Sequence, residues 1–318
     1  MRWYPGAWRA RYGDEFAELL MSDICERPRS AARTLDVARG GVVARLARTG
    51  LCGVALGRSE QARASLALLG CCLAVFLGFG AAMWSQLTIG WQWSQPAHAA
   101  TTVATVVTSV TMLAFAGLGL LAAAPVAWAV ASRIVRGRSR GLVVPAVVFC
   151  VAVAVAVVGA RHFQNGWPGT GGHAAGRPGL VPPGIAAFSW ASTLFVSAYW
   201  AHPSALGAFP AAELAWMAVS PVALAVAVAA AATVVRRTEL PLAVLRFEIR
   251  LGSAACAAMT VFLAGCCSWL AAGDRAQHDL FHFGAIDVAG VAVMTVALAI
   301  AQHAVHRARR SGLAATAG

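Results

Sequence analysis

The sequence contains no lysine, and only 12% of its 318 residues are charged. Soluble globular domains carry about 25% charged residues, so half that share is typical of a membrane protein. Hydrophobic residues make up 59% of the chain. The net charge of +12 comes from arginines at the ends of apolar runs rather than along one polar face. This distribution argues against a nucleic-acid-binding protein, which gathers its basic residues on one surface.

Motifs that would carry chemistry are scarce. Without lysine there is no Gly-x-x-x-x-Gly-Lys-Ser/Thr loop, so ATP is not bound through that motif. The eight cysteines form no Cys-x-x-Cys pair, and six lie inside apolar runs, where we expect them to pack as small residues. The central turns of the apolar runs contain no Asp, Glu, His, Lys or Arg, which disfavours a proton- or sodium-coupled transporter. We expect no cofactor, and the sequence favours a non-catalytic protein over an enzyme.

Six apolar runs are long enough to cross a membrane as helices, because about 20 residues span a hydrocarbon core of roughly 30 Å. They lie at 65–84, 103–131, 142–160, 212–235, 252–272 and 285–302. We interpret a shorter aromatic run at 185–200 as an interfacial or re-entrant helix within an outer loop at 161–211. The predicted fold class is all-α, a polytopic membrane bundle of six transmembrane helices in residues 64–304.

Arginine placement predicts the orientation of this bundle. Eleven arginines precede residue 64, four lie in 133–140, four in 236–250 and three in a basic tail at 305–318. The opposite side has only Arg161, Arg177 and Arg275. Because basic loops remain inside, we expect both termini in the cytoplasm and a location in the bacterial plasma membrane. Retention of the 133–140 loop in the cytoplasm is enough to explain its arginines. The same four side chains are also candidates for contact with lipid or a partner: Arg133, Arg136, Arg138 and Arg140.

Residues 1–63 have the pattern of a cytoplasmic helical prefix. Apolar residues recur every three or four positions between Pro5 and Pro28, which predicts an amphipathic helix. A second helix is expected after Ser30, which would cap it. The hairpin is too small to bury much core, so we expect it to lie on the membrane surface or on the bundle. The aromatic residues expected to anchor it or to meet a partner are Trp3, Tyr4, Trp8 and Tyr12.

The prefix carries a recognisable pattern in two parts. The first part is Trp3-Tyr4-Pro5-x-x-Trp8-Arg9-x-Arg11-Tyr12-Gly13-Asp14-Glu15-Phe16, and the second is Asp36-Val37-x-Arg39-Gly40. This pattern resembles the short prefix ahead of the membrane region in many bacterial permeases and uncharacterised actinobacterial membrane proteins. The resemblance covers about the first 50 residues and implies a helical module ahead of the membrane region, and it gives almost no indication of a reaction. The transmembrane part resembles no family that we can name.

One polar cluster on the outer side has a spacing suited to a metal. Asp274, His278 and His282 follow one another at four-residue intervals, on one face if the segment is helical. Carboxylate and imidazole ligands at this spacing can share a divalent ion such as zinc. The alternative, which we favour, is a polar outer loop with incidental histidines, because no motif such as His-Glu-x-x-His is present.

Small residues recur at every fourth position in two of the runs, and such stripes let helices approach closely in lipid. The first stripe comprises Gly70, Ala74, Gly78 and Ala82, and the second Gly252, Cys256, Thr260, Ala264 and Ser268. The leading hypothesis is a non-catalytic membrane protein that acts through helix or partner contacts, with a homo-oligomer as one form. A permease subunit for an apolar or amphipathic substrate is the alternative. A metal-handling protein or enzyme that uses the outer cluster is a third.

Overall fold

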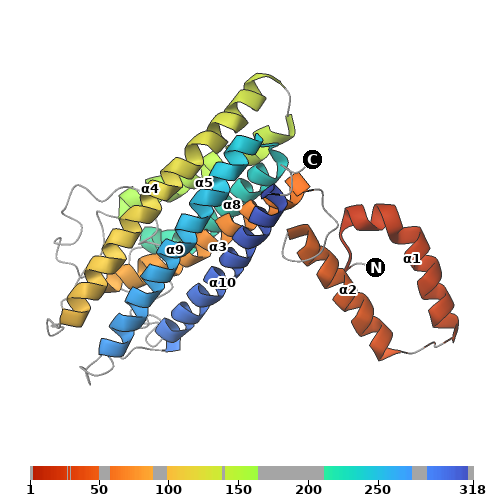
Figure 1. Ribbon diagram of the computed structural model, residues 1–318, viewed down its shortest axis with the longest axis horizontal. Helices are drawn as coiled ribbons and strands as arrows, with labels where there is room; N and C mark the ends of the chain where they lie inside the picture. Colours follow the sequence, from red (N-terminus) through yellow and green to blue (C-terminus); the bar gives the residue numbers. More distant parts are fainter. Residues whose placement is uncertain are drawn as a thin grey trace.

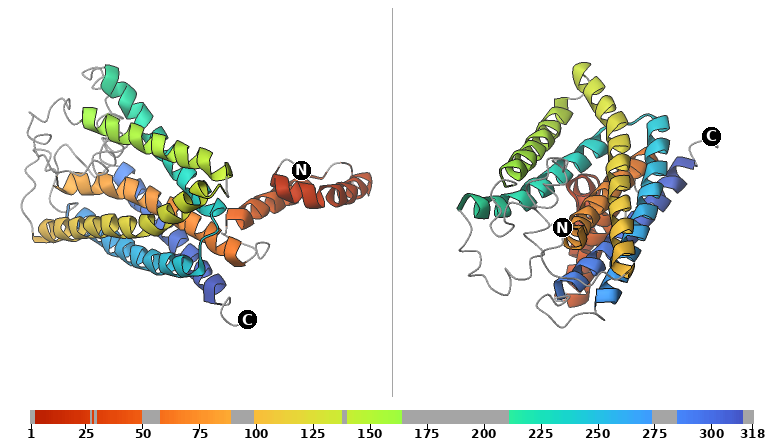
Figure 2. Two further views of the ribbon diagram at one scale, coloured as in Figure 1. Left: turned by 90° about the horizontal axis from the view of Figure 1, so that it is seen from above. Right: turned by 90° about the vertical axis from the view of Figure 1, so that its left-hand side faces the viewer.

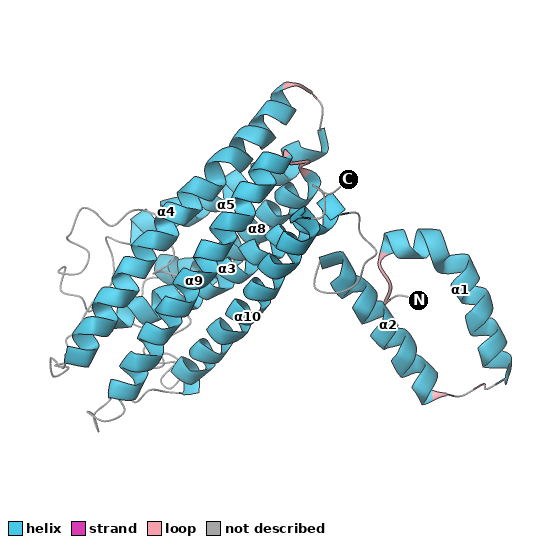
Figure 3. Cartoon of the chain, in the orientation of Figure 1, coloured by secondary structure: helices cyan, strands magenta, loops and turns pink. Residues whose placement is uncertain are grey.

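The structure is a computed structural model that describes residues 3–26, 28, 30–49, 58–88, 99–137, 140–163, 211–273 and 285–313. Within these ranges the regular structure is helical and includes no strand (Figure 3), which confirms the all-α class. The helices are α1 (Gly6–Glu26), α2 (Ala31–Thr49), α3 (Arg58–Thr88), α4 (Ala99–Val135), α5 (Arg140–Phe163), α8 (Ala211–Arg237), α9 (Leu242–Gly273) and α10 (Ala285–Leu313). The run at 185–200 lies outside the described residues.

Four helices are long and apolar enough to cross a membrane, which indicates a membrane protein. Their apolar stretches are Ser59–Ala81, Thr102–Val135, Leu242–Ala271 and Val288–Ser311, and α5 carries a shorter one, Gly141–Ala156. Large side chains on the outside of these helices remain exposed, such as Leu120 (75%) and Trp128 (78%) on α4. Exposed apolar surface of this kind suits contact with lipid rather than water.

Helix α3 occupies the middle of the bundle (Figures 1 and 2). It packs against α10, α8 and α9, while α4 lies along α9 and α5 along α8. Helices α3, α5 and α9 begin at the end of the bundle where α4, α8 and α10 finish, and we call this the arginine-rich end. The hairpin of α1 and α2 extends beyond that end in Figure 1 and in the left-hand view of Figure 2.

The core between α3, α4, α9 and α10 is filled by large side chains. The rings of Phe76, Phe115 and Phe262 meet with centroids 5.8–6.3 Å apart, at tilted or edge-on angles that aromatic pairs prefer. Met83 and Met259 are fully buried beside them. A continuous packed core of this kind holds the four helices in one arrangement.

Glycines permit the closest approaches between these helices, and only part of each small-residue stripe takes part. A methyl group on Gly80 would lie 3.0 Å from the Phe262 ring, and one on Gly265 would lie 3.1 Å from Thr108. In the stripes, Gly252 is buried against Leu69 and Val305, whereas Gly70 has open space beside it. A four-residue repeat drifts around a helix of 3.6 residues per turn, so a long stripe cannot stay on one contact face.

Two helices extend past the predicted domain boundaries. The basic tail is predicted at 305–318, and α10 continues into it as far as Leu313, with Val305, Ala308 and Ser311 buried on the bundle. The prefix is predicted to reach residue 63, and α3 begins within it at Arg58, with Ala62 buried. In both places small or apolar residues continue the packed face into an arginine-rich segment.

Candidate functional site: the helical prefix and the arginine-rich end

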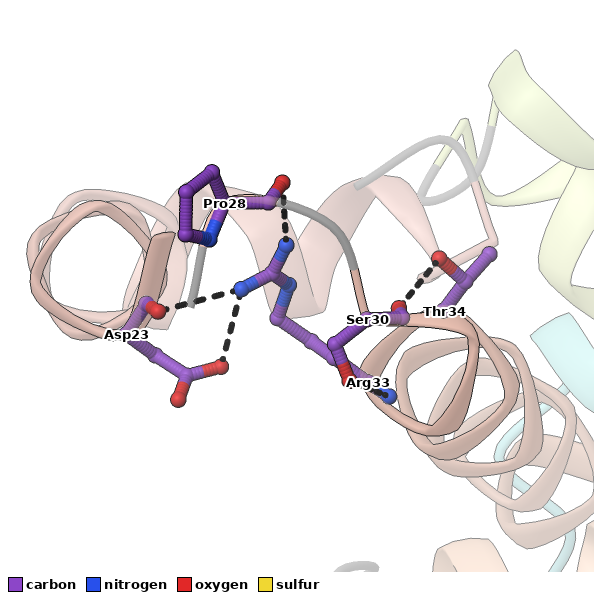
Figure 4. A network of polar contacts seen from close by, with 5 residues as sticks. All are labelled: Asp23, Pro28, Ser30, Arg33 and Thr34. Atoms are coloured by element: carbon purple, nitrogen blue, oxygen red, sulfur yellow. Dashed lines mark hydrogen bonds and ion pairs between the residues drawn. The ribbon is translucent and has the colours of Figure 1, made fainter. Parts of the chain in front are cut away.

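The turn of the prefix is held by Arg33 (Figure 4). Its guanidinium donates to the carboxylate of Asp23 at 3.3 Å, to the Asp23 carbonyl at 3.1 Å and to the Pro28 carbonyl at 3.4 Å. Ser30 caps α2, because its Oγ accepts the Arg33 backbone N–H at 3.2 Å. The predicted cap and the bracketing prolines are therefore confirmed. One arginine fixes the angle between α1 and α2.

Aromatic rings form the interior of the prefix. Tyr4 stacks on Trp8 with centroids 4.0 Å apart, and Phe16 packs edge-on against Trp8 at 5.3 Å. Burial raises the pKa of the Tyr4 hydroxyl, and the Asp36 carboxylate adds to the rise. Tyr4 is therefore a core residue and not the interfacial anchor that was expected, since Trp8 and Phe16 cover it. Trp8 is half-buried in the same stack, while Tyr12 is 40% exposed.

The two parts of the prefix pattern meet in space. Gly40 faces the hydroxyl of Tyr4, and Gly41 faces the Cβ and backbone of Trp3, so closely that a side chain on either glycine would collide. The first residues of the pattern therefore pack on the glycines that follow Asp36. This contact closes the hairpin at the end opposite to Arg33.

The outer faces of the prefix keep large apolar side chains uncovered. Leu19 is 70% exposed and Leu35 73%, and they are joined by Trp3, Met21, Ile24, Val42 and Val43. Exposed acidic residues accompany them on α1: Asp14, Glu15, Glu18 and Glu26. A small domain rarely leaves this much apolar surface open without a partner.

Arginines tie the helices together at the arginine-rich end. Arg133 pairs with Glu239 at 3.0 Å, Arg237 donates to the Gly141 carbonyl at 3.0 Å, and Arg63 donates to the Thr238 carbonyl at 3.4 Å. Of the other predicted contact residues, Arg136 is exposed, Arg138 lies outside the described residues, and Arg140 begins α5. Residues 137–141 fit the pattern Gly-x-Ser-x-Gly. They connect α4 to α5, whereas a nucleophile elbow connects a strand to a helix.

An acidic side chain that the sequence analysis passed over is buried at this end. Glu248 is 9% exposed, and its Oε1 has no hydrogen-bond partner among the residues that the structure describes, as is also true of the Ser65 hydroxyl. Each residue precedes by one turn the contact between Leu69 of α3 and Gly252 of α9. Because α3 and α9 run in the same direction, both polar groups lie at one level of the bundle. The burial of Glu248 could have been predicted from its spacing. Glu248 precedes Gly252 by four residues, so both lie on the same packed face of α9.

Replacing Glu248 with glutamine should raise the free energy of unfolding. A buried polar group without a partner costs about 1–3 kcal/mol and an ionised one costs more, so the neutral amide removes part of the penalty. Chemical unfolding of the purified protein in mild detergent measures the change. The exposed Glu60 of α3 provides the control, and Glu60→Gln should alter stability by less than about 0.5 kcal/mol. A Glu248→Gln protein less stable than the parent would contradict this account of the carboxylate.

The predicted metal cluster Asp274, His278 and His282 lies outside the described residues. Within the described ranges, no group of three His, Cys, Asp or Glu side chains is close enough to hold a metal ion. Cysteines in those ranges are all free thiols, and three of them, Cys72, Cys256 and Cys266, are buried in the bundle. Among the residues that the structure describes, the candidate site features are the uncovered prefix and the polar arginine-rich end. Comparison of the chain with protein-family models, curated proteins and solved structures finds no match.

Proposed function

We propose that this chain is a non-catalytic protein of the bacterial plasma membrane that presents its prefix to a protein partner in the cytoplasm. The observation that carries the proposal is the set of exposed apolar side chains on the hairpin, led by Leu19 and Leu35, which no other described part of the chain covers. The hairpin extends away from the bundle, so both of its outer faces are accessible.

The proposal includes six transmembrane helices with both termini inside. At 1.5 Å per residue, the 24 residues of α5 and the 27 of α8 reach about 36 Å and 40 Å, enough for a hydrocarbon core of roughly 30 Å. The two helices pack on each other, and α8 also packs on α3. The helix ends that carry the arginines, at 58–63, 133–140, 236–250 and 305–313, all lie at one end of the bundle. This supports a cytoplasmic location for that end.

The surface chemistry of the prefix favours a protein over the membrane as its partner. Exposed charges of both signs surround the apolar side chains: Glu15 and Glu18 lie near Leu19, and Arg9 and Arg11 are exposed on the same helix. Protein interfaces combine an apolar centre with a polar rim, which matches this arrangement. The filled core of the bundle, with Phe76 and Phe262 completely buried, favours a contact role over passage of a substrate.

Site-specific photocrosslinking in living cells tests the proposal. A photoreactive residue at position 19 or 35 should form one discrete adduct with a protein. The same residue at Leu120 of α4, which is equally exposed but lies on the membrane stretch, should not form that adduct. Leu35→Glu should abolish the adduct formed from position 19, since a charge would be buried in the interface. Absence of a protein adduct from both prefix positions would overturn the proposed function.

The orientation is checked in the same cells. Cys25 is exposed on α1, so a membrane-impermeant maleimide should modify it only after the plasma membrane is opened. A Cys25→Ser variant identifies the signal from this residue. Modification of Cys25 on intact spheroplasts would place the prefix outside and refute the proposed topology.

A further inference from the structure

A groove between α9 and α10 opens to the side of the bundle near the arginine-rich end. It has a volume of about 360 Å³, within the range of small-ligand sites. Its walls are two helix faces with residues at intervals of three or four: Ser253, Cys256, Ala257 and Thr260 on α9, and Gln302, Val305, His306 and Arg309 on α10. The lining contains no acidic residue, and its one permanent charge is the Arg309 guanidinium.

Hydrogen bonding turns Arg309 toward the groove. Its Nη2 donates to the Ser253 hydroxyl at 2.6 Å, and that hydroxyl donates to the Ile249 carbonyl at 2.8 Å. Arg307 points elsewhere, because with the Gln61 amide oxygen oriented toward it, its guanidinium donates to Gln61 of α3 at 2.8 Å. Arg310 does not line the groove. Arg309 is therefore the one arginine that lines the groove. Its hydrogen-bond partner, the Ser253 hydroxyl, is neutral and does not compensate the positive charge of the guanidinium.

The depth of the groove matches the boundary of a bilayer. At 1.5 Å per residue, His306 lies about 27 Å and Arg309 about 32 Å along α10 from Val288, so the two side chains lie on either side of the edge of a hydrocarbon core of roughly 30 Å. Beyond Ala257 toward the membrane interior, Val261 is 48% exposed and offers an apolar surface for an acyl chain. The hydrogen-bond donors of Arg309, His306 and Gln302 therefore lie closer to the arginine-rich end than the apolar surface at Val261.

We propose that this groove binds one anionic phospholipid, with its phosphate against Arg309 and its acyl chain along α9. Positive charge, neutral hydrogen-bond donors and the lack of carboxylates complement a phosphate, and the sideways opening admits a molecule that is already in the bilayer. The assignment requires only that α9 and α10 cross a membrane. It does not depend on the partner of the prefix.

Native mass spectrometry of the delipidated full-length protein tests the assignment. Titration with phosphatidylglycerol should give one bound lipid with at least tenfold higher affinity than phosphatidylcholine with the same acyl chains. Arg309→Gln should lower the phosphatidylglycerol affinity about tenfold, and Arg309→Lys should lower it less. The neighbouring Arg310→Gln carries the same loss of charge and should bind as the parent does.

The remaining outcomes are also decisive. Equal losses for the two glutamine variants, or equal affinity for the two lipids, would show general charge attraction and overturn the site. Displacement of phosphatidylglycerol by millimolar inorganic phosphate would assign the groove to a free anion instead. Thermal unfolding of each variant in detergent shows whether it remains folded, and the Arg309→Lys protein supplies the affinity comparison if Arg309→Gln does not. None of these results changes with the outcome of crosslinking from the prefix.

Discussion

Phe262→Ala should destabilise the bundle more than any other single truncation of a side chain in α9. The Phe262 ring is fully buried, touches the Phe76 and Phe115 rings, and lies against the bare backbone of Gly80. Phe→Ala in a packed core costs about 3–5 kcal/mol. Part of that cost reflects transfer from water, which lipid reduces, so we expect about 2–3 kcal/mol here.

Unfolding in mixed micelles of mild detergent and dodecyl sulfate measures this loss. Phe247→Ala is the matched control, because Phe247 is on the same helix but is 41% exposed. Its replacement should cost less than about 1 kcal/mol. If both variants lose the same stability, the three rings do not form the centre of the fold.

Gly41→Ala should open the prefix hairpin. A Cβ at this position would lie 2.9 Å from the Trp3 carbonyl carbon and still closer to the Trp3 Cβ, and a backbone segment cannot rotate aside as a side-chain end can. Overpacking of this kind costs about 1–3 kcal/mol, against a gain of about 1 kcal/mol in helix propensity. A two-helix hairpin has little stability in reserve, so we expect a large change in its folded population.

Amide hydrogen exchange measures this opening, with faster exchange expected through both α1 and α2 and no change in α9. Gly13→Ala is the control, because a Cβ there would meet only the Arg9 Cβ at an ordinary 3.9 Å. That variant should exchange as slowly as the parent or more slowly. Slow exchange in Gly41→Ala would mean that Trp3 does not close the hairpin.

Local patterns were sufficient to predict most of the helices. The bracketing prolines and the Ser30 cap define α1 and α2, and long apolar runs define the bundle helices, because both signals depend on near neighbours in the chain. Orientation of helix faces is a different matter. Whether Gly70 or Gly252 contacts another helix depends on residues far away in the sequence. Both glycines stand in a four-residue stripe, so the sequence predicted a helix contact for each of them alike.

In the candidate site, too, features that depend on contacts between distant parts of the chain were not predicted. The burial of Glu248 follows from the meeting of Leu69 with Gly252, a contact across more than 180 residues that no local pattern contains. The packing of Tyr4 on Gly40 likewise joins two parts of the prefix pattern that sequence reading treats separately. Trp8 and Tyr12 were predicted from the same spacing, yet Trp8 is half-buried and Tyr12 is 40% exposed, so the period alone does not separate covered from uncovered positions.

The placement of α10 along α3 has a consequence for biosynthesis. The chain is made from its N-terminus, so α3 emerges more than 200 residues before the helix that covers it most extensively. Until then the face of α3 that packs on α10 lacks its final neighbour. The first and the last of the four long apolar helices therefore complete the core together, and a chain that ends before residue 285 lacks the helix that covers most of α3.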